Sequence, residues 1–482
     1  MASFKTDESF LEKISIGAIG TQQVFSVLKQ LGHQPIELER GSMNYKIWKK
    51  FKIKRIRVPD ILCVDNGIRI ESRAKTKLEI SMSHSTSDPY RGWDFGMKDN
   101  DYVALVVCEK FGDNPIDWKA DHLVQFISIK ELREAATNEQ IVFIKAKGAQ
   151  EGFEVRINWP ASIASSEGIV TEIDKTIKYK TLEGKTKRVG LSKGGKMLSP
   201  LVRVGDKVFP NQILASVIKA QKTIPTPKVN TDFFLNNLSS LILSDRYAAA
   251  KALNYFNEAK VVTALKDRIG IAEEDTYVKL EAAASLARLG HEEGYNFIKT
   301  FLKDPYLGNV LESVIVLAEI KTDLACEMLC DILLDETFDA EIRAGAAWGL
   351  GEQQNKSALK AVVTSFNSVE TNIKIEAARA LAKLTKNFSN DILNSFEKAT
   401  TIEKPGVSWA LTKSTTLNLD QLILNLKDLD SRHWISFIIG THGEERYIAE
   451  IEKLKKKDPE VYFAVTLLWK LMTSWTHDLK EY

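Results

Sequence analysis

The sequence predicts a multidomain protein: an α/β sandwich, then a small β module, then an all-α solenoid. With 482 residues the chain is too long for one ordinary domain. A strand-like stretch near residue 60 runs into Asp-Asn-Gly, which predicts a hairpin, and an Ala- and Leu-rich pattern recurs after residue 246. The expected parts are the sandwich at 1–160, the β module at 161–220, a linker at 221–231 and the solenoid at 232–482.

The chain opens with an amphipathic pattern over residues 8–31, which predicts two helices or one kinked helix ended by Gly32. A short strand is expected at 35–38. Residues 45–57 then interleave seven cations with three aromatic residues. Such a stretch can bind phosphates and stack on bases, or it can be a solvated strand face with its aromatics turned inward. The candidate nucleic-acid-binding residues are Lys46, Trp48, Lys49, Lys50, Lys52, Lys54 and Arg55.

The expected hairpin brings acidic and basic side chains together. A two-residue turn at Asn66-Gly67 predicts that Asp60 faces Arg73 across the ribbon, and it places Glu71 on the same face as Asp60. The two carboxylates then lie within roughly 8 Å at Cβ, close enough to bind one divalent cation. Arg73 and Lys75 continue along this face, because strand residues alternate with a period of two.

The opposite face of the hairpin supports this register. Ile61, Cys63 and Ile70 all point away from the charged side chains and are expected to enter a core. The simpler interpretation is that Asp60 and Glu71 are ordinary charges on a solvated face, with salt bridges to the surface cations Arg69, Arg73 or Lys75.

Pro59-Asp60 followed by Glu71-Ser72-Arg73 resembles the signature of the PD-(D/E)xK nuclease superfamily, over about the first 150 residues. The resemblance implies that Asp60, Glu71 and the carbonyl of Ser72 bind Mg²⁺ or Mn²⁺. Arg73 stands where the family has Lys, and an arginine can stabilise charge but cannot act as a base. Lys75 is a candidate replacement. The first helix offers Gln22 and Gln23 where the family often has a glutamate.

The remainder of the first domain reads as a sheet with a covering helix. Residues 101–108 form a continuous apolar run, as expected of a central strand buried on both faces. Another strand is expected at 122–129 and a helix at 130–136. These elements favour an α/β or α+β sandwich.

Residues 166–218 change to short strand patterns separated by glycines. The sequences around Gly168 and Val204 resemble the two halves of a barrel-sandwich hybrid, the fold of biotinyl and lipoyl domains. No lysine sits in a tight hairpin between the halves, so we expect a β module without a prosthetic group. Five cations between residues 185 and 196 could bind phosphates, but we favour flexible solvated loops as their explanation.

The back half is repetitive. Equivalent leucines are separated by 33, 31, 33 and 31 residues: Leu253, Leu286, Leu317, Leu350 and Leu381. Small alanines around them allow paired helices to pack closely, and Gly290 and Gly351 are expected to end helices. This pattern resembles HEAT-like repeats, which present a long surface to a partner. Degenerate repeats are expected to continue to residue 471, with Trp469 and Trp475 in a capping stretch.

The formal net charge of +2 conceals an uneven distribution. Residues 1–230 contain 37 Lys plus Arg against 27 Asp plus Glu, which gives +10. The rest contains 29 against 37, which gives −8. The basic half suits nucleic acid, with DNA favoured over RNA, and the acidic solenoid suits a protein partner.

The four cysteines, Cys63, Cys108, Cys326 and Cys330, show no CxxC spacing and are expected to be buried thiols. No signal peptide or membrane-spanning apolar run is recognisable, so we expect a soluble cytoplasmic protein without membrane contact.

The leading hypothesis is a Mg²⁺-dependent nuclease that uses Asp60, Glu71, Arg73 and Lys75, with a solenoid that docks a partner. The alternative is a nuclease fold without turnover that serves as an adaptor for nucleic acid or protein. A third interpretation makes the solenoid the functional part and the front half a docking domain.

Overall fold

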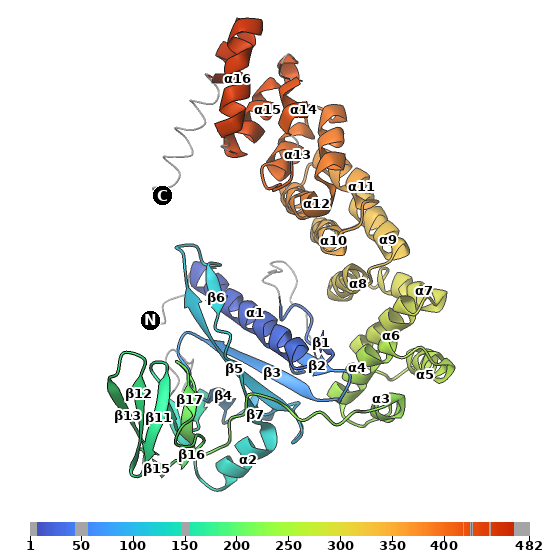
Figure 1. Cartoon of the computed structure of the whole chain (residues 1–482). Helices are drawn as coiled ribbons and strands as arrows, with labels where there is room; N and C mark the ends of the chain where they lie inside the picture. The colour runs from blue at the N-terminus through green and yellow to red at the C-terminus, as the bar shows by residue number, and fades with distance from the viewer. Residues whose placement is uncertain are drawn as a thin grey trace. The chain divides into compact units, whose positions relative to one another are not determined.

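The computed structural model describes residues 7–43, 56–145, 154–417, 419–424, 426, 428–442 and 445–466. Contacts divide the chain into two compact units, the first ending at Val278 and the second running on from Lys279. The first unit holds an α/β domain, a β module and the first helices of the back half (Figure 1). The described part of the second unit consists of helices and their connections. A multidomain protein with an α/β part and a helical-repeat part is therefore confirmed.

A mixed sheet forms the centre of the α/β domain, in the order β1-β2-β3-β5-β6, with β7 paired to β5. Strands β3 and β5 are parallel, whereas the other pairs are antiparallel. The elements are α1 (Asp7–Gln30), β1 (Pro35–Glu37), β2 (Ile61–Cys63), β3 (Arg69–Lys75), β5 (Tyr102–Lys110), β6 (Trp118–Ala120), β7 (Gln125–Ser128) and α2 (Ile129–Thr137).

Helix α1 lies along one face of this sheet, over β3 and β5 (Figure 1). It is a single helix, and Gly32 follows it at a φ of +86°, as its predicted terminator. The approach is close because position 20 is glycine: a Cβ there would overlap the Cβ of Ala74. Val24 and Leu28 of α1 are fully buried in the core that it forms with the sheet.

The other face of β5 is covered by a second apolar cluster. Val103, Leu105 and Val107 point into it and meet Trp93 and Trp159. Strand β5 is thus buried on both faces over most of its length, as predicted from its apolar run. A small three-stranded sheet lies beside this cluster: β4 (Ser81–Ser85), β9 (Glu154–Asn158) and β8 (Val142–Lys145).

The β module contains short antiparallel sheets around a core that includes Tyr179, Val208 and Leu214. Its described strands do not close into a barrel. They are β10 (Ala161–Ile163), β11 (Gly168–Ile173), β12 (Thr176–Thr181), β13 (Thr186–Gly190), β14 (Ser192–Lys193), β15 (Lys196–Met197), β16 (Ser199–Pro200), β17 (Lys207–Val208) and β18 (Ile213–Ser216).

The segment that leaves the module follows the α/β domain. The backbones of Gln221 and Phe126 exchange two hydrogen bonds, of 2.7 and 2.9 Å. Ile224 enters the core beside α1, and the amide of Val229 donates to the carbonyl of Asp65 at 2.9 Å. The stretch expected to be a linker is therefore attached to the domain that it leaves.

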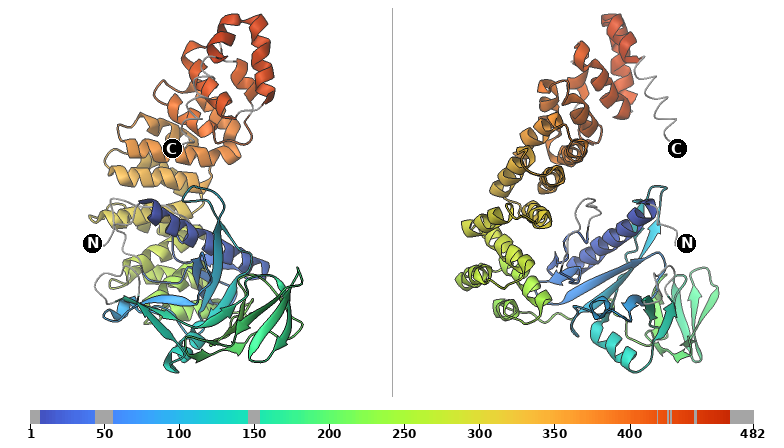
Figure 2. Two further views of the ribbon diagram at one scale, coloured as in Figure 1. Left: turned by 90° about the vertical axis from the view of Figure 1, so that its left-hand side faces the viewer. Right: turned by 180° about the vertical axis from the view of Figure 1, so that it is seen from behind.

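Helices make up the rest of the described chain, and in the second unit they stack in pairs (Figure 2). They are α3 (Thr231–Leu238), α4 (Leu243–Ala252), α5 (Ala259–Gly270), α6 (Thr276–Arg288), α7 (Glu292–Phe301), α8 (Leu307–Glu319), α9 (Asp323–Leu334), α10 (Ala340–Gln353), α11 (Ala358–Thr364), α12 (Thr371–Lys398), α13 (Lys404–Leu411), α14 (Leu419–Leu424), α15 (Leu429–His442) and α16 (Glu445–Lys457).

The leucine period corresponds to real repeats. Its five leucines are all fully buried, and the last four lie in α6, α8, α10 and α12. Gly290 follows α6 with a positive φ, as predicted. Gly351 was wrongly expected to end a helix: it lies inside α10, where a Cβ would come within 2.8 Å of the Cα of Ala380. Its role is to let α10 and α12 approach each other.

The capping tryptophans Trp469 and Trp475 lie outside the described residues. Over the part of the chain that the structure describes, no helix combines the length and the apolar character needed to cross a bilayer.

Candidate functional site

The hairpin of β2 and β3 positions the predicted carboxylates. Ile61 pairs with Ile70 and Leu62 with Arg69, so a four-residue loop, 64–67, joins the strands. The predicted two-residue turn, with Asp60 opposite Arg73, is wrong by two residues of register. Because side chains alternate with a period of two, this shift leaves every residue on its predicted face and brings Asp60 level with Glu71.

Local hydrogen bonds explain the longer loop. The side chain of Asn66 accepts from the amide of Ile68 at 2.9 Å, and the amide of Gly67 donates to the carbonyl of Cys63 at 2.8 Å. Gly67 has a φ of +72°, a region that other residues avoid. Asp65 lies in the loop and is not paired with Ile68 as predicted. Its carboxylate accepts a hydrogen bond from the amide of Gln34 at 2.9 Å.

The candidate side chains stand on the sheet face away from α1. In the parallel pairing of β3 with β5, Glu71 is beside Val103, Arg73 beside Leu105 and Lys75 beside Val107. These β5 residues point into the cluster opposite α1, and register partners share a face. That face is therefore apolar along β5 and charged along β3.

Asp60 is the most enclosed member of the site, with 9% of its surface exposed. Its Oδ2 accepts from the amide of Ser72 at 2.7 Å, and its carbonyl accepts from the amide of Leu38 at 2.7 Å. Burial raises the pKa of the Asp60 carboxyl well above its usual value, and the nearby charges of Glu71 and Glu39 raise it further. The Ser72 amide and the charge of Arg73 oppose this rise without cancelling it.

Glu39 is a third carboxylate that the motif did not reveal. Its amide lies 3.2 Å from the carbonyl of Asp60, because the chain leaving β1 crosses the start of β2. The sequence signal was weak, since Glu39 precedes Asp60 by 21 residues across the basic stretch.

Arg73 is paired with one of the two carboxylates and is partly exposed. Its Nη2 forms an ion pair with Oε1 of Glu71 at 2.9 Å, and 35% of its side chain is exposed. The simpler interpretation of the motif, a salt-bridged surface pair, thus describes Glu71 correctly. It does not describe Asp60, whose surroundings are buried and acidic.

Lys75 points into a pocket of oxygen atoms from the chain that leads into β4. Its Nζ donates to the side-chain oxygen of Ser81 at 2.5 Å, to the Ser81 carbonyl at 3.1 Å and to the carbonyl of Glu79 at 3.3 Å. Burial lowers the pKa of Lys75 to about 8. The ammonium is therefore held by β4 and not by the carboxylate pair.

The remaining predicted residues divide into two groups. Gln22, on α1, donates from its side chain to the carbonyl of Met43 at 2.6 Å. The predicted nucleic-acid-binding residues lie outside the described part of the structure: Lys46, Trp48, Lys49, Lys50, Lys52, Lys54 and Arg55.

Two further clusters were not foreseen. His33, Cys63 and Asp65 bring possible metal-ligand atoms within 4.8 Å of one another, and the ring of His33 lies 3.0 Å from the carboxylate of Asp65. Burial, followed by the charge of Asp65, raises the pKa of the Cys63 thiol, which keeps it protonated. The His33–Asp65 contact joins the hairpin loop to the end of α1, a structural role that accounts for the cluster without an ion.

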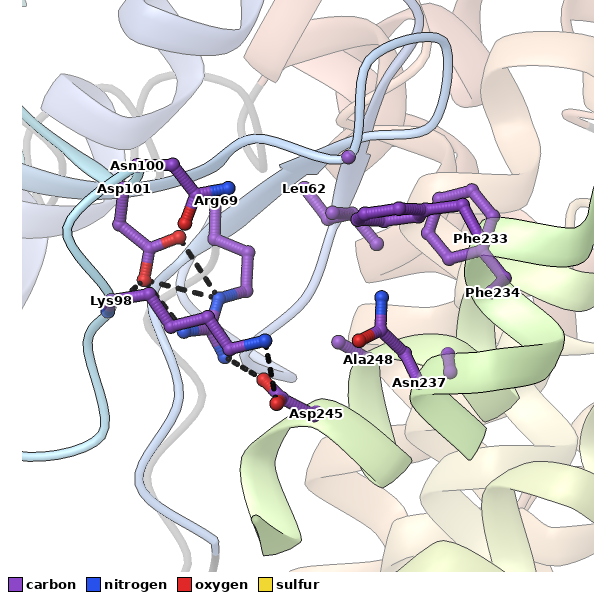
Figure 3. A pocket seen from close by; sticks show the side chains of 12 residues that line it. Leu62, Arg69, Lys98, Asn100, Asp101, Phe233, Phe234, Asn237, Asp245 and Ala248 are labelled. Atoms are coloured by element: carbon purple, nitrogen blue, oxygen red, sulfur yellow. Dashed lines mark hydrogen bonds and ion pairs between the residues drawn. The ribbon is translucent and has the colours of Figure 1, made fainter. Parts of the chain in front are cut away.

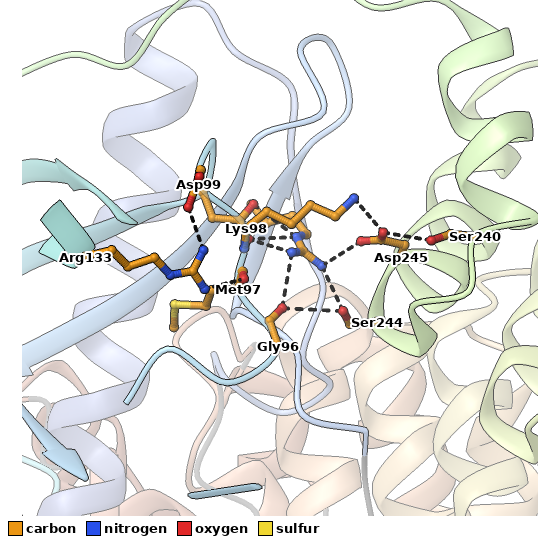
Figure 4. A network of polar contacts seen from close by, with 10 residues as sticks. Gly96, Met97, Lys98, Asp99, Arg133, Ser240, Ser244 and Asp245 are labelled. Atoms are coloured by element: carbon orange, nitrogen blue, oxygen red, sulfur yellow. Dashed lines mark hydrogen bonds and ion pairs between the residues drawn. The ribbon is translucent and has the colours of Figure 1, made fainter. Parts of the chain in front are cut away.

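The second cluster surrounds Arg69, which is only 3% exposed although it lies two residues from Glu71 (Figure 3). Its guanidinium bonds both carboxylate oxygens of Asp101, the closest at 2.6 Å, and reaches Asp245 of α4 at 3.3 Å. Lys98 also pairs with Asp245, at 2.5 Å, and Ser244 donates to the carbonyl of Gly96 (Figure 4). This network fastens α4 to the strand that carries the candidate site.

Comparison with known proteins assigns neither a family nor a function to the chain. No family model matches the chain, and no curated protein matches it. Similar solved structures include the complex of CpcE and CpcF of phycocyanin lyase from Nostoc sp. PCC7120, at 16% identity and a TM-score of 0.25, covering 51% of this chain and 95% of that one.

Two others are an engineered protein, at 18% identity and a TM-score of 0.24, covering 44% and 98%, and human deoxyhypusine hydroxylase in complex with glycerol, at 13% and 0.18, covering 50% and 84%. At these TM-scores the similarity identifies neither a family nor a function.

Proposed function

We propose that the α/β domain is a metal-dependent nuclease of the PD-(D/E)xK type, which hydrolyses phosphodiester bonds. The observation that carries this proposal is the level placement of Asp60 and Glu71 on one face of the β2–β3 hairpin. The family resemblance rests on the motif Pro59-Asp60 and Glu71-Ser72-Arg73, and the covering helix, the hairpin and the buried strand around the motif support the proposal.

The donor set fits a divalent cation. Oδ2 of Asp60 already accepts one amide hydrogen, which fixes the carboxylate and leaves its other oxygen for a ligand role. Repulsion among Asp60, Glu71 and Glu39 makes the site favourable for positive charge. Mg²⁺ prefers carboxylate and carbonyl oxygens, so Asp60, Glu71 and the carbonyl of Ser72 would hold it. The chemistry that a bound Mg²⁺ would supply is polarisation of a phosphodiester and a lower pKa of bound water.

The cations of β3 have separate tasks. Arg73 is partly exposed beside Glu71, so its guanidinium can turn toward the phosphate and stabilise the negative charge that develops there. Lys75 holds the start of β4 through Ser81, which orients the end of β3. A lysine with a pKa of about 8 can also give up its proton near neutral pH, which an arginine cannot do.

Cleavage assays test the proposal. The full chain is incubated with labelled DNA and, separately, labelled RNA in Mg²⁺, Mn²⁺ or EDTA. We expect metal-dependent cleavage that Asp60→Ala abolishes, whereas the matched exposed change Glu109→Gln leaves it unaltered. Circular dichroism verifies that both variants are folded. Cleavage that persists in folded Asp60→Ala would refute the assignment of this site.

A second candidate function follows from the ion pair of Arg73 with Glu71, which occupies one of the proposed metal ligands. A chain whose Glu71 stays neutralised in this way is an adaptor that holds nucleic acid or protein without cleaving it. Arg73→Lys separates the two functions. If that variant cleaves nucleic acid and the natural chain does not, the natural protein is the adaptor.

The proposed role of the helical repeats is to bind a partner protein. Their net negative charge favours a protein partner over nucleic acid, in contrast with the basic front half. Pull-down with the full chain and with a variant that carries lysines in place of exposed acidic solenoid residues tests this role. The charge-altered variant is expected to lose the partner.

A further inference from the structure

An exposed aromatic pair lies between β4 and β5. Tyr90, in the short 3₁₀ helix Pro89–Arg91, is 72% exposed, and Phe95 is 38% exposed. Their rings meet edge to face, with centroids 5.3 Å apart and planes at 70°. Single exposed hydrophobic residues are common in proteins, so the pair acquires meaning only from what surrounds it.

The backbone beneath Tyr90 is held from two sides. Its amide donates to Oδ1 of Asp88 at 2.9 Å, and its carbonyl accepts from Nη1 of Arg57 at 2.9 Å. The same guanidinium lies 5.8 Å from the centre of the Phe95 ring. At Gly96 a Cβ would come within 2.8 Å of the Arg57 carbonyl, so these two segments pack tightly. A ring presented by a fixed backbone loses little conformational entropy when it binds.

The segment that carries the pair packs on the candidate site's side of the sheet through two other residues. Trp93 and Met97, which flank Phe95 in sequence, cover the β5 face that points away from α1. Glu71 stands on this same face, one strand away. Arg57 is separated from Asp60 by only two residues.

Two guanidinium groups lie near the pair, together with the carboxylates of Asp88 and Glu154. Arg57 is exposed and is the last cation of the basic stretch. Arg91 is 62% exposed at its side chain and shares an ion pair with Glu154. An exposed ring with guanidinium groups beside it matches the two features of a nucleotide, a flat base and a charged phosphate.

We propose that Tyr90 stacks on an unpaired base and that Arg57 binds the adjoining phosphate, so that the protein takes single-stranded nucleic acid. This inference rests on the proposed function and adds its substrate class. Bases inside a duplex are stacked on each other and offer no face to a side chain, whereas every base of a single strand does. Duplex binding would therefore depend on the phosphates alone.

Fluorescence anisotropy of the full chain tests the proposal in EDTA, where metal-dependent cleavage is prevented. The probes are labelled oligothymidine of about 12 nucleotides, within the usual site size of single-strand binders, and a duplex of matched length. Tyr90→Ala is expected to weaken single-strand binding by about 5- to 150-fold, the loss of one stacked base, and to leave duplex binding unchanged. Tyr90→Phe keeps the ring and is expected to bind as the natural chain does.

Phe111→Ala is the matched control, because Phe111 is 66% exposed but has no guanidinium among its described contacts. It should bind both probes normally. The proposal is overturned if Tyr90→Ala binds oligothymidine as tightly as the natural chain, or if it loses duplex affinity to the same extent, which would indicate general damage or a surface for another partner.

The two proposals fail in different ways. Asp60→Ala is expected to bind oligothymidine in EDTA as the natural chain does, since stacking needs no metal ligand. A natural chain that binds but does not cleave contradicts the nuclease and leaves the stacking surface intact. A chain that cleaves and is unaffected by Tyr90→Ala contradicts the stacking surface alone.

Discussion

At the scale of single residues, the candidate site depends on the burial of Asp60. A carboxylate with 9% of its surface exposed, close to two others, is destabilising unless a proton or a cation neutralises it. Functional sites commonly retain such unfavourable arrangements, because the strain is released when the ligand binds.

Asp60→Asn should therefore stabilise the metal-free protein at neutral pH. Burial, then Glu71, raises the folded-state pKa of Asp60 above the 3.8 of the unfolded chain. The folded state binds the proton more tightly, so this contribution to stability is present below pH 3.8 and is lost as pH rises through the folded pKa. An asparagine resembles the protonated, neutral form of Asp60, so the Asp60→Asn variant keeps this contribution to stability at every pH.

Urea unfolding in EDTA at several pH values measures this effect. The stability difference between Asp60→Asn and the natural chain should grow from acidic to neutral pH. A difference that stays constant with pH would show that Asp60 is not ionising in a buried environment. Adding Mg²⁺ should stabilise the natural chain and not the variant.

Lys75 is expected to make stability depend on pH in the opposite direction. Burial lowers its pKa to about 8 in the folded state, below the 10.5 of an exposed lysine. Between these values the unfolded chain binds more protons, so stability should rise with pH across this window. Lys75→Met removes that contribution. The difference between the urea unfolding midpoints of the natural chain and of this variant should therefore change between about pH 7.5 and about pH 10. An unchanged gap contradicts the burial of the ammonium.

At the scale of elements, the hairpin shows what sequence could and could not predict. Alternation of apolar and charged residues was enough to assign the faces of β2 and β3, and burial of Ile61, Cys63 and Ile70 confirms that assignment. The predicted turn was too short because Asn66 and Gly67 make the hydrogen bonds of a longer loop, and because Asp65 bonds to the segment after α1. Contacts of this kind between distant segments leave no mark in a local pattern.

The same reason explains why the Arg69 network was missed. Arg69 was expected to be one of several surface cations, yet Asp101 and Asp245, 32 and 176 residues further along, bury it. The leucine repeats, in contrast, could be predicted because each repeat places a leucine at the same packing position, so the pattern recurs along the sequence. All five leucines are buried in the structure.

Arg69→Met tests how α4 is fastened to β3. The change leaves Asp101, 1% exposed, without its guanidinium partner, and removing one member of a buried ion pair typically costs about 3–5 kcal/mol. Unfolding in urea should show a loss of that order. The double variant Arg69→Met with Asp101→Asn should recover part of it, since the buried charge is then absent. A loss below about 1 kcal/mol for Arg69→Met would contradict a fastening role.

At the scale of the whole molecule, the division of charge separates two kinds of partner. The front half carries +10 and the back half −8, so nucleic acid should bind through the first and be sensitive to salt. For three to five neutralised phosphates on a single strand, affinity should fall roughly 20- to 100-fold between about 50 and about 200 mM salt.

Charge reversal locates the contact. Lys50→Glu, in the basic stretch, should weaken binding and reduce the salt slope. Lys356→Glu is the matched control, because its side chain is 64% exposed in the acidic second unit. Binding that is insensitive to salt, or equally weakened by both variants, would favour the interpretation in which the solenoid is the functional part.

The central claim is that Asp60 and Glu71 bind one divalent cation together, and calorimetric titration with Mn²⁺ tests it most directly. We expect binding to the natural chain and to the control Glu109→Gln, and its loss in both Asp60→Asn and Glu71→Gln. If Mn²⁺ binds all four proteins alike, or binds none of them while they remain folded, these two carboxylates do not form a metal site.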